Sequence, residues 1–86
     1  MNAMTKEEIH EKIDAIIIEQ LGVYSDDIQP DAILGRELGA DGIDAVELTV
    51  KLEETFGIHV PDAQMNSLDT YSVKDVFELV EKLIDK

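Results

Sequence analysis

The chain has 86 residues, of which 44% are apolar, and its 20 acidic against 7 basic side chains give a formal net charge of −13 at pH 7. This length predicts one domain with a small core, and the apolar fraction is too high for a disordered chain. The lack of cysteine excludes disulfides and thiolate metal sites. The charge disfavours nucleic acid and anionic membranes as partners and favours basic proteins, although it can also serve solubility alone.

No apolar run reaches the roughly 18 residues that span a membrane, and no signal-peptide pattern opens the chain. We therefore expect a cytoplasmic protein without membrane insertion. Residues 1–3 precede a second methionine, Met4, and are set aside as an expression remnant. Residues 4–86 are expected to form a single domain.

The first predicted helix extends from about Lys6 to Leu21. Thr5 and Glu8 have the spacing of a capping box, and Gly22 is typical of the residue that ends a helix. The apolar stripe at helical spacing consists of Ile9, Ile13, Ile16, Ile17 and Leu21.

Residues 22–40 contain glycine, proline, serine and aspartate in a pattern typical of turns. The segment is long for a structureless loop, so its apolar residues are expected to hold it against the core. These are Val23, Ile28, Ile33, Leu34 and Leu38. A short helical turn is predicted around Ile33 to Leu38.

Asp41 is a favourable N-cap for a second helix from about Gly42 to Phe56, which Gly57 ends. Asp44 lies in the first turn, where the helix dipole favours a negative charge. One apolar line at helical spacing is expected to face the core: Ala45, Leu48, Leu52 and Phe56.

The last helix is predicted to begin after a Ser72 cap and to reach Ile84. Its expected buried face consists of Val73, Val76, Phe77, Val80, Leu83 and Ile84. Between the second and last helices, residues 58–60 alternate like a strand but have no partner strand, and residues 63–67 can form a short helix. The predicted fold is all-α, a bundle of three main helices and one short helix.

The second helix carries another apolar line that the core does not need: Ile43, Val46 and Val50. The carboxylates that flank it are Asp44, Glu47, Glu53 and Glu54. A partly exposed apolar stripe edged with carboxylates fits a docking surface for a basic, grooved partner. The alternative interpretation is a wide core face with an ordinary solvated back.

Metal binding and catalysis find little support in the sequence. An EF-hand loop with Gly42 at its sixth position would place Gly39 and Leu48 where ligands are required. His10 and His59 have no partner at metal-ligand spacing and are interpreted as surface or interface residues. The three serines, Ser25, Ser67 and Ser72, have turn or cap explanations, so we expect neither a resident metal nor an enzyme.

The stretch GADGIDAVELTVKLEETFGIHVPD resembles the acyl carrier proteins, the four-helix carriers of fatty acid and polyketide synthesis. The likeness extends over nearly all of residues 4–86. The family pattern is roughly L-G-A-D-S-L-D-x-V-E-L, followed by L-E-x-x-F and a proline-aspartate turn. The matching residues are Leu38, Gly39, Ala40, Asp41, Asp44, Val46, Glu47, Leu48, Leu52, Glu53, Phe56, Pro61 and Asp62.

The resemblance implies that acyl groups are carried as thioesters on a 4′-phosphopantetheine arm, which is esterified to the serine after the motif's first aspartate. Asp41 matches that aspartate, but Gly42 stands at the serine and has no hydroxyl. The implied partners are fatty acid or related synthase enzymes and a phosphopantetheinyl transferase. The chain is expected to bind them as a monomer. As written, the chain is expected to dock on them without receiving the arm.

Three explanations of Gly42 stay open. One is that the serine was replaced by engineering. Another is that the chain is a divergent paralogue that lost carrier chemistry and acts as an interaction module. A modified side chain can also have been written as glycine. The neighbouring Asp41, Asp44 and Glu47 are retained, which mildly favours a recent or artificial loss.

Overall fold

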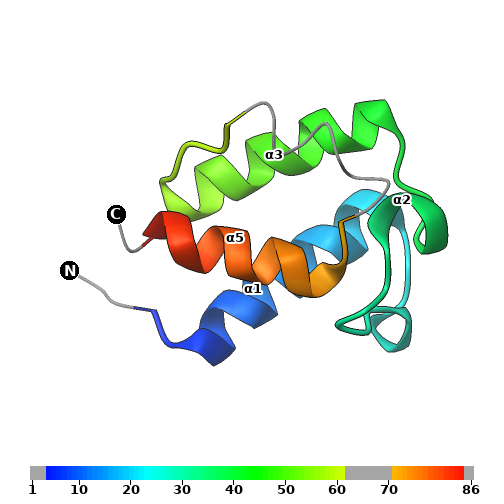
Figure 1. Cartoon of the computed structure of the whole chain (residues 1–86), viewed down its shortest axis with the longest axis horizontal. Helices are drawn as coiled ribbons and strands as arrows, with labels where there is room; N and C mark the ends of the chain where they lie inside the picture. Colours follow the sequence, from blue (N-terminus) through cyan, green and yellow to red (C-terminus); the bar gives the residue numbers. More distant parts are fainter. Residues whose placement is uncertain (1–3, 62–70, 85–86) are drawn as a thin grey trace.

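The computed structural model describes residues 4–61 and 71–84, and within them the chain is all-α, as predicted (Figure 1). The elements are α1 (Lys6–Leu21), the 3-10 turn η1 (Ser25–Asp27), the short α2 (Leu34–Glu37), α3 (Gly42–Phe56) and α5 (Val73–Ile84). The predicted boundaries of the three long helices are confirmed. The suggested helix at residues 63–67, with Ser67 and Asp62, lies outside the described residues.

The ends of α1 are fixed by local hydrogen bonds. The Glu8 N–H donates to Thr5 Oγ1 at 3.1 Å, and the Thr5 N–H donates to Glu8 Oε1 at 2.9 Å, which is the predicted capping box. At the other end, Gly22 has φ 70° and its N–H donates to Ile18 O at 2.8 Å. This left-handed conformation suits glycine because it carries no Cβ.

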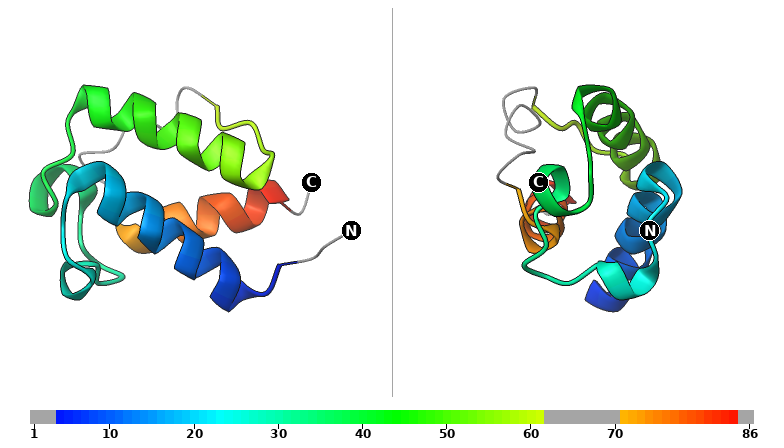
Figure 2. Two further views of the ribbon diagram at one scale, coloured as in Figure 1. Left: turned by 180° about the vertical axis from the view of Figure 1, so that it is seen from behind. Right: turned by 90° about the vertical axis from the view of Figure 1, so that its right-hand side faces the viewer.

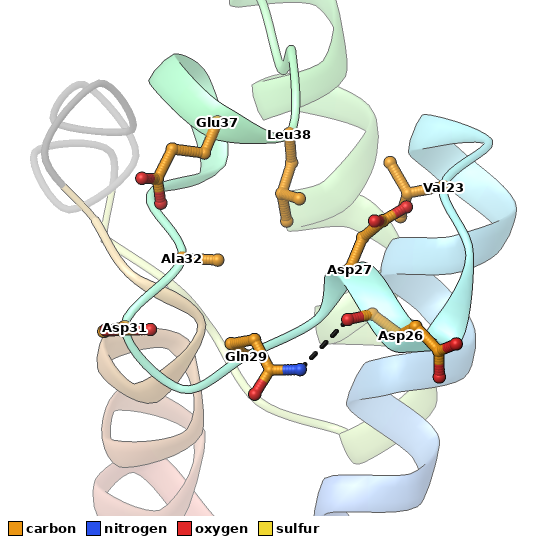
Figure 3. Close-up of a pocket in the computed structure, with 8 residues that line it drawn as sticks. All are labelled: Val23, Asp26, Asp27, Gln29, Asp31, Ala32, Glu37 and Leu38. Atoms are coloured by element: carbon orange, nitrogen blue, oxygen red, sulfur yellow. Dashed lines mark hydrogen bonds between the residues drawn. The ribbon is translucent and has the colours of Figure 1, made fainter.

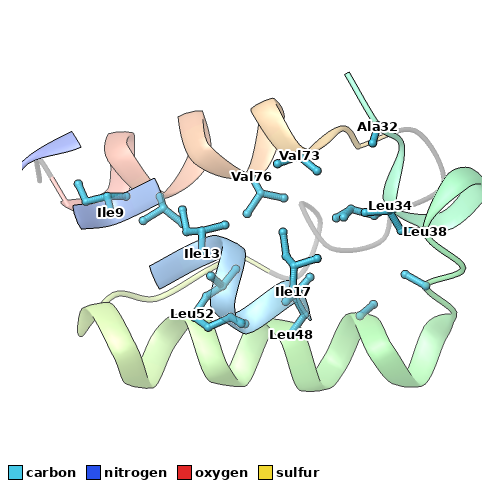
Figure 4. Packing of buried hydrophobic residues seen from close by; sticks show 14 residues of the cluster. Ile9, Ile13, Ile17, Ala32, Leu34, Leu38, Leu48, Leu52, Val73 and Val76 are labelled. Carbon is cyan, nitrogen blue, oxygen red and sulfur yellow. The ribbon is translucent and has the colours of Figure 1, made fainter. Parts of the chain in front are cut away.

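The three long helices enclose one apolar core. α1 packs against both α3 and α5, and α3 and α5 also contact each other (Figures 1 and 2). Figure 4 shows isoleucines of α1 between leucines of α3 and valines of α5. The side chains without measurable exposure are Ile13, Ile17, Leu34, Leu48, Leu52, Val73 and Val80. Ala45, Leu48 and Leu52 are buried as predicted, with Phe56 partly buried against them.

The segment between α1 and α3 is held to one end of the bundle, as expected from its apolar residues. Leu34 and Leu38 are buried, and Val23 and Ile28 pack against the core in partly buried positions. The predicted helical turn is present as α2. Two backbone hydrogen bonds attach this segment to the start of α5: the Leu34 N–H donates to Tyr71 O and the Val73 N–H donates to Ala32 O, both at 2.9 Å.

The buried face of α5 was predicted only in part. Val73, Val76 and Val80 are buried, and Phe77 and Leu83 are partly buried. The prediction for Ile84 was wrong, because this last residue of α5 is 37% exposed. Leu79 is buried and was missed, although it follows Val76 at helical spacing.

None of the helices found in residues 4–61 and 71–84 combines the length and the apolar character that crossing a membrane demands.

Candidate functional site

The site begins at the N-terminus of α3, where two aspartates cap the helix. The Asp44 N–H donates to Asp41 Oδ1 at 2.9 Å, and the Asp41 N–H donates to Asp44 Oδ2 at 3.1 Å. The Asp41 backbone is extended, with φ −115° and ψ −171°. These carboxylates satisfy backbone donors that the first turn leaves unpaired, and their charge lies at the positive end of the helix dipole. The first residue after the cap is therefore held in a defined position.

That residue is Gly42, which is exposed. A Cβ built on Gly42 meets no atom within 4 Å, and its φ is not among the positive glycine values of the chain. Neither the backbone nor the surroundings of position 42 therefore require glycine. Any side chain here would project into solvent from the start of the helix.

The second apolar line of α3 is exposed along its length. Ile43 is 71%, Val46 64% and Val50 45% exposed, whereas Ala45, Leu48 and Leu52 on the same helix are buried. The core therefore takes only one side of α3, and the wide-core-face interpretation does not describe this structure. Exposed apolar side chains in a row are typical of an interaction surface.

The flanking carboxylates differ in their surroundings. Glu47 and Glu54 are exposed, whereas Asp44 and Glu53 are partly buried. Glu53 Oε2 accepts a hydrogen bond from the Val60 N–H at 2.8 Å and lies 3.4 Å from His59 Nδ1. Glu53 thus also holds the segment that follows α3. We call the exposed apolar line and these four carboxylates the α3 surface: Ile43, Asp44, Val46, Glu47, Val50, Glu53 and Glu54.

A residue of α1 that sequence reasoning missed reaches the α3 surface. The side-chain amide of Gln20 donates to Asp44 Oδ1 at 3.5 Å and also to Glu47 Oε1. The end of α1 lies beside the first half of α3 in Figures 1 and 2. Gln20 belongs to the stretch EQLGV before Tyr24, which shares in the family resemblance, but no local pattern assigns its side chain a role.

Comparisons with known proteins show which family the chain resembles. The family model described as "Phosphopantetheine attachment site" matches residues 11–79, a range that includes Gly42. The chain is 45% identical over 80 residues to an acyl carrier protein of Akkermansia muciniphila, covering 93% of this chain and 98% of that protein. It is 41% identical over 76 residues to an acyl carrier protein of Campylobacter hominis, covering 88% and 94% of the two chains. A third, of Thermosynechococcus vestitus, is 38% identical over 81 residues, or 94% and 98%.

The chain belongs to the acyl carrier protein family. The group implied by this family, 4′-phosphopantetheine, needs a side-chain hydroxyl for its attachment, and Gly42 has none. Thr49 is seven residues further along α3, roughly 10 Å at the helical rise. Its Oγ1 donates to Ala45 O at 2.8 Å, so it points back along the helix. The residues at the start of α3 therefore do not fit a covalently attached arm.

Ser72, His10 and His59 each have contacts that serve the structure. The Asp75 N–H donates to Ser72 Oγ at 3.1 Å, which confirms Ser72 as the cap of α5. His10 lies at the interface of α1 and α5: its ring stacks on Phe77 with centroids 3.8 Å apart, and Nε2 lies 3.2 Å from Glu81 Oε2. His59 is exposed beside Glu53.

One turn after His10, Asp14 is partly buried in α1. Burial raises the pKa of its carboxyl above 3.8, and the charge of His10 offsets part of that effect. Its Oδ1 is buried and has no hydrogen-bond partner among the described residues. Asp14 is therefore a carboxylate whose ionisation works against folding.

A hollow of about 610 Å³ lies between the end of α1 and α2 (Figure 3). Its walls are apolar at Val23, Ala32 and Leu38 and carry the carboxylates of Asp26, Asp27, Asp31 and Glu37. Two of these carboxylates serve the fold: Asp27 Oδ2 accepts from the Tyr24 N–H, and Glu37 Oε1 accepts from the Ile33 N–H. Within the described part of the chain, no group of three or more potential ligands is arranged to hold a metal ion.

Proposed function

We propose that this chain is an acyl carrier protein scaffold of fatty acid synthesis, or of a related lipid or polyketide synthesis. It presents the α3 surface to the enzymes that load and use a carrier. Because Gly42 has no hydroxyl, the chain receives no 4′-phosphopantetheine arm. The observation that carries the proposal is the exposed position of Gly42, directly after the Asp41 cap and next to the exposed apolar line of α3.

The chemistry of the α3 surface supports a basic protein partner. Ile43, Val46 and Val50 supply apolar area that loses water on contact, and the carboxylates around them provide a polar rim. With a net charge of −13, the chain attracts a basic patch over a distance and accelerates encounter. The partners we infer are synthase enzymes and a phosphopantetheinyl transferase, met by a monomer in the cytoplasm.

The chain itself performs no catalysis in this proposal. In a carrier the reacting thioester belongs to the arm, and the protein supplies position and recognition. Ser72 caps α5, His10 stacks on Phe77 and His59 lies beside Glu53, so these three side chains have structural contacts rather than those of a nucleophile–base pair.

Binding to a purified phosphopantetheinyl transferase tests docking without covalent transfer, because Gly42 cannot be modified. Val46→Arg and Glu47→Lys are expected to weaken the affinity by roughly tenfold or more, with affinity falling as salt rises. Glu11→Lys is the matched control, because it makes the same charge change on an exposed residue of α1. If all three variants bind as the original chain does, at every salt concentration, the α3 surface is only a solvated face.

A second candidate follows from the same observation. An interaction module that binds carrier partners without carrying acyl groups would keep the α3 surface and lack the hydroxyl, as this chain does. Gly42→Ser separates the two: a scaffold that differs from a carrier only in this side chain regains loading, whereas a diverged module does not. The gene's codon at position 42 separates natural from engineered glycine.

A further inference from the structure

The amide of Gln20 bridges two carboxylates of the α3 surface. Gln20 is the second-to-last residue of α1, and its Nε2 donates to Asp44 Oδ1 and to Glu47 Oε1. The other Asp44 oxygen, Oδ2, accepts from the Asp41 N–H at 3.1 Å. Both oxygens of Asp44 therefore have donors within the protein, whereas Glu47 contributes only one oxygen to this network.

The two carboxylates are three residues apart, so they are neighbours on the surface of α3 and repel each other. A side-chain amide between them supplies a donor to each without adding a positive charge, which keeps the surface fully negative. The two carboxylates also differ in burial, because Asp44 is partly buried and Glu47 is exposed. The contact also crosses between helices, since Gln20 is 24 and 27 residues away from its two acceptors.

We propose that Gln20 is a positioning residue for docking. Its hydrogen bond keeps the Asp44 side chain in contacts within the protein, and it orients Glu47 as the carboxylate that a basic partner contacts. This inference rests on the proposed function and deepens it, because it makes the two carboxylates unequal. Asp44 acts on stability through the cap and the bridge. Glu47 acts on affinity through its free oxygen, with Gln20 reducing the number of orientations that binding must fix.

The test measures calorimetric affinity for a purified phosphopantetheinyl transferase, together with the melting temperature of each variant. Gln20→Met keeps the length of the side chain and removes both donors, and it is expected to weaken affinity about threefold to tenfold. Gln29→Met is the matched control, because it also removes a side-chain amide, one that donates to Asp26 O at 3.0 Å in the loop before α2. It is expected to leave affinity within twofold.

Gln20→Glu separates orientation from charge. It has nearly the same shape but replaces the donor by a third carboxylate. If net acidity alone governed docking, this variant would bind a basic partner more tightly. Our inference predicts weaker binding, because the new carboxylate repels Glu47 from its position.

A double-mutant cycle separates positioning from a general structural effect. In a Glu47→Gln background, Gln20→Met is expected to change affinity by less than twofold, because the carboxylate it orients is gone. Asp44→Asn is expected to lower the melting temperature more than Glu47→Gln does and to reduce affinity less.

The outcomes also separate this inference from the proposed function. If Gln20→Met binds normally while Val46→Arg and Glu47→Lys bind weakly, docking stands and the role of Gln20 is refuted. If Gln20→Glu binds more tightly, the surface works by charge alone and the inference is likewise refuted. If none of the α3 variants changes affinity, the proposed function itself fails.

Discussion

Alanine at Gly42 and at Gly57 should change stability in opposite directions. Gly42 is the first residue of α3, and Gly57 is the residue that ends it. A Cβ meets no atom within 4 Å at either position, so space does not distinguish them. The backbone does, because Gly57 has φ 65° and ψ 37°, whereas Gly42 has no positive φ.

The size of each stability change follows from the backbone conformation of the glycine that is replaced. Replacing glycine by alanine inside a helix stabilises by roughly 0.5–1 kcal/mol, and at the first helical residue we take about 0.5 kcal/mol. For a domain of this size that corresponds to a rise in melting temperature of about 2–4 °C. At Gly57 an alanine in the left-handed conformation costs about 1–2 kcal/mol, so the melting temperature should fall by at least about 4 °C.

The assay is thermal unfolding followed by circular dichroism, with urea titration to obtain free energies of unfolding. A fall in melting temperature for Gly42→Ala would refute the reasoning, because position 42 would then require glycine for the fold. An equal loss of unfolding free energy for Gly42→Ala and Gly57→Ala would show that the ends of α3 do not have the backbone conformations described. The expected result leaves the fold with no reason to exclude serine at position 42.

Three further predictions concern the core, the cap and pH. Leu48→Ala should lower the free energy of unfolding by about 2–5 kcal/mol, because this side chain has no exposure; a loss below about 1 kcal/mol in urea would contradict the described core. Asp41→Ala should cost about 1 kcal/mol through loss of the cap, and an unchanged urea midpoint would contradict it. Asp14→Asn should raise the melting temperature at neutral pH. Because the folded-state pKa of Asp14 is raised, the protonated carboxyl favours the fold and that advantage is lost as pH rises through this pKa. The gain from asparagine should therefore shrink as pH falls through that value, and a gain that grows on acidification would contradict the assignment.

Helix boundaries could be predicted from the sequence because local contacts set them. Thr5 with Glu8, and Asp41 with Asp44, are three residues apart, and each pair forms its capping box in the structure. Gly22 and Gly57 adopt the left-handed conformation at helix ends that glycine accepts most easily. Such contacts need no knowledge of the rest of the fold.

The buried faces were less predictable. Periodicity indicates which side of a helix is apolar, but it does not indicate how far along the helix a neighbour covers that side. Ile84 satisfies the period and is exposed at the end of α5, whereas Leu79 is buried further back. Coverage depends on where α1 crosses α5, which is a property of the tertiary arrangement.

The candidate site was likewise predictable only where its features are set within one helix. The cap and the exposed line of α3 could be predicted, because both follow from the order of residues within one helix. The Gln20 bridge could not, since it joins residues from two helices whose approach depends on packing. The amide of Gln20 carries no signal in a local pattern, and only the structure brings it to Asp44 and Glu47.

The most direct test of the central claim is the mass of two proteins after incubation with a phosphopantetheinyl transferase and coenzyme A. The account predicts that the chain with Gly42 keeps its mass and that Gly42→Ser gains the mass of one phosphopantetheine arm. A mass gain on the Gly42 chain would place the attachment atom elsewhere. No gain on Gly42→Ser, with a known carrier protein modified in a parallel reaction, would contradict the carrier scaffold itself.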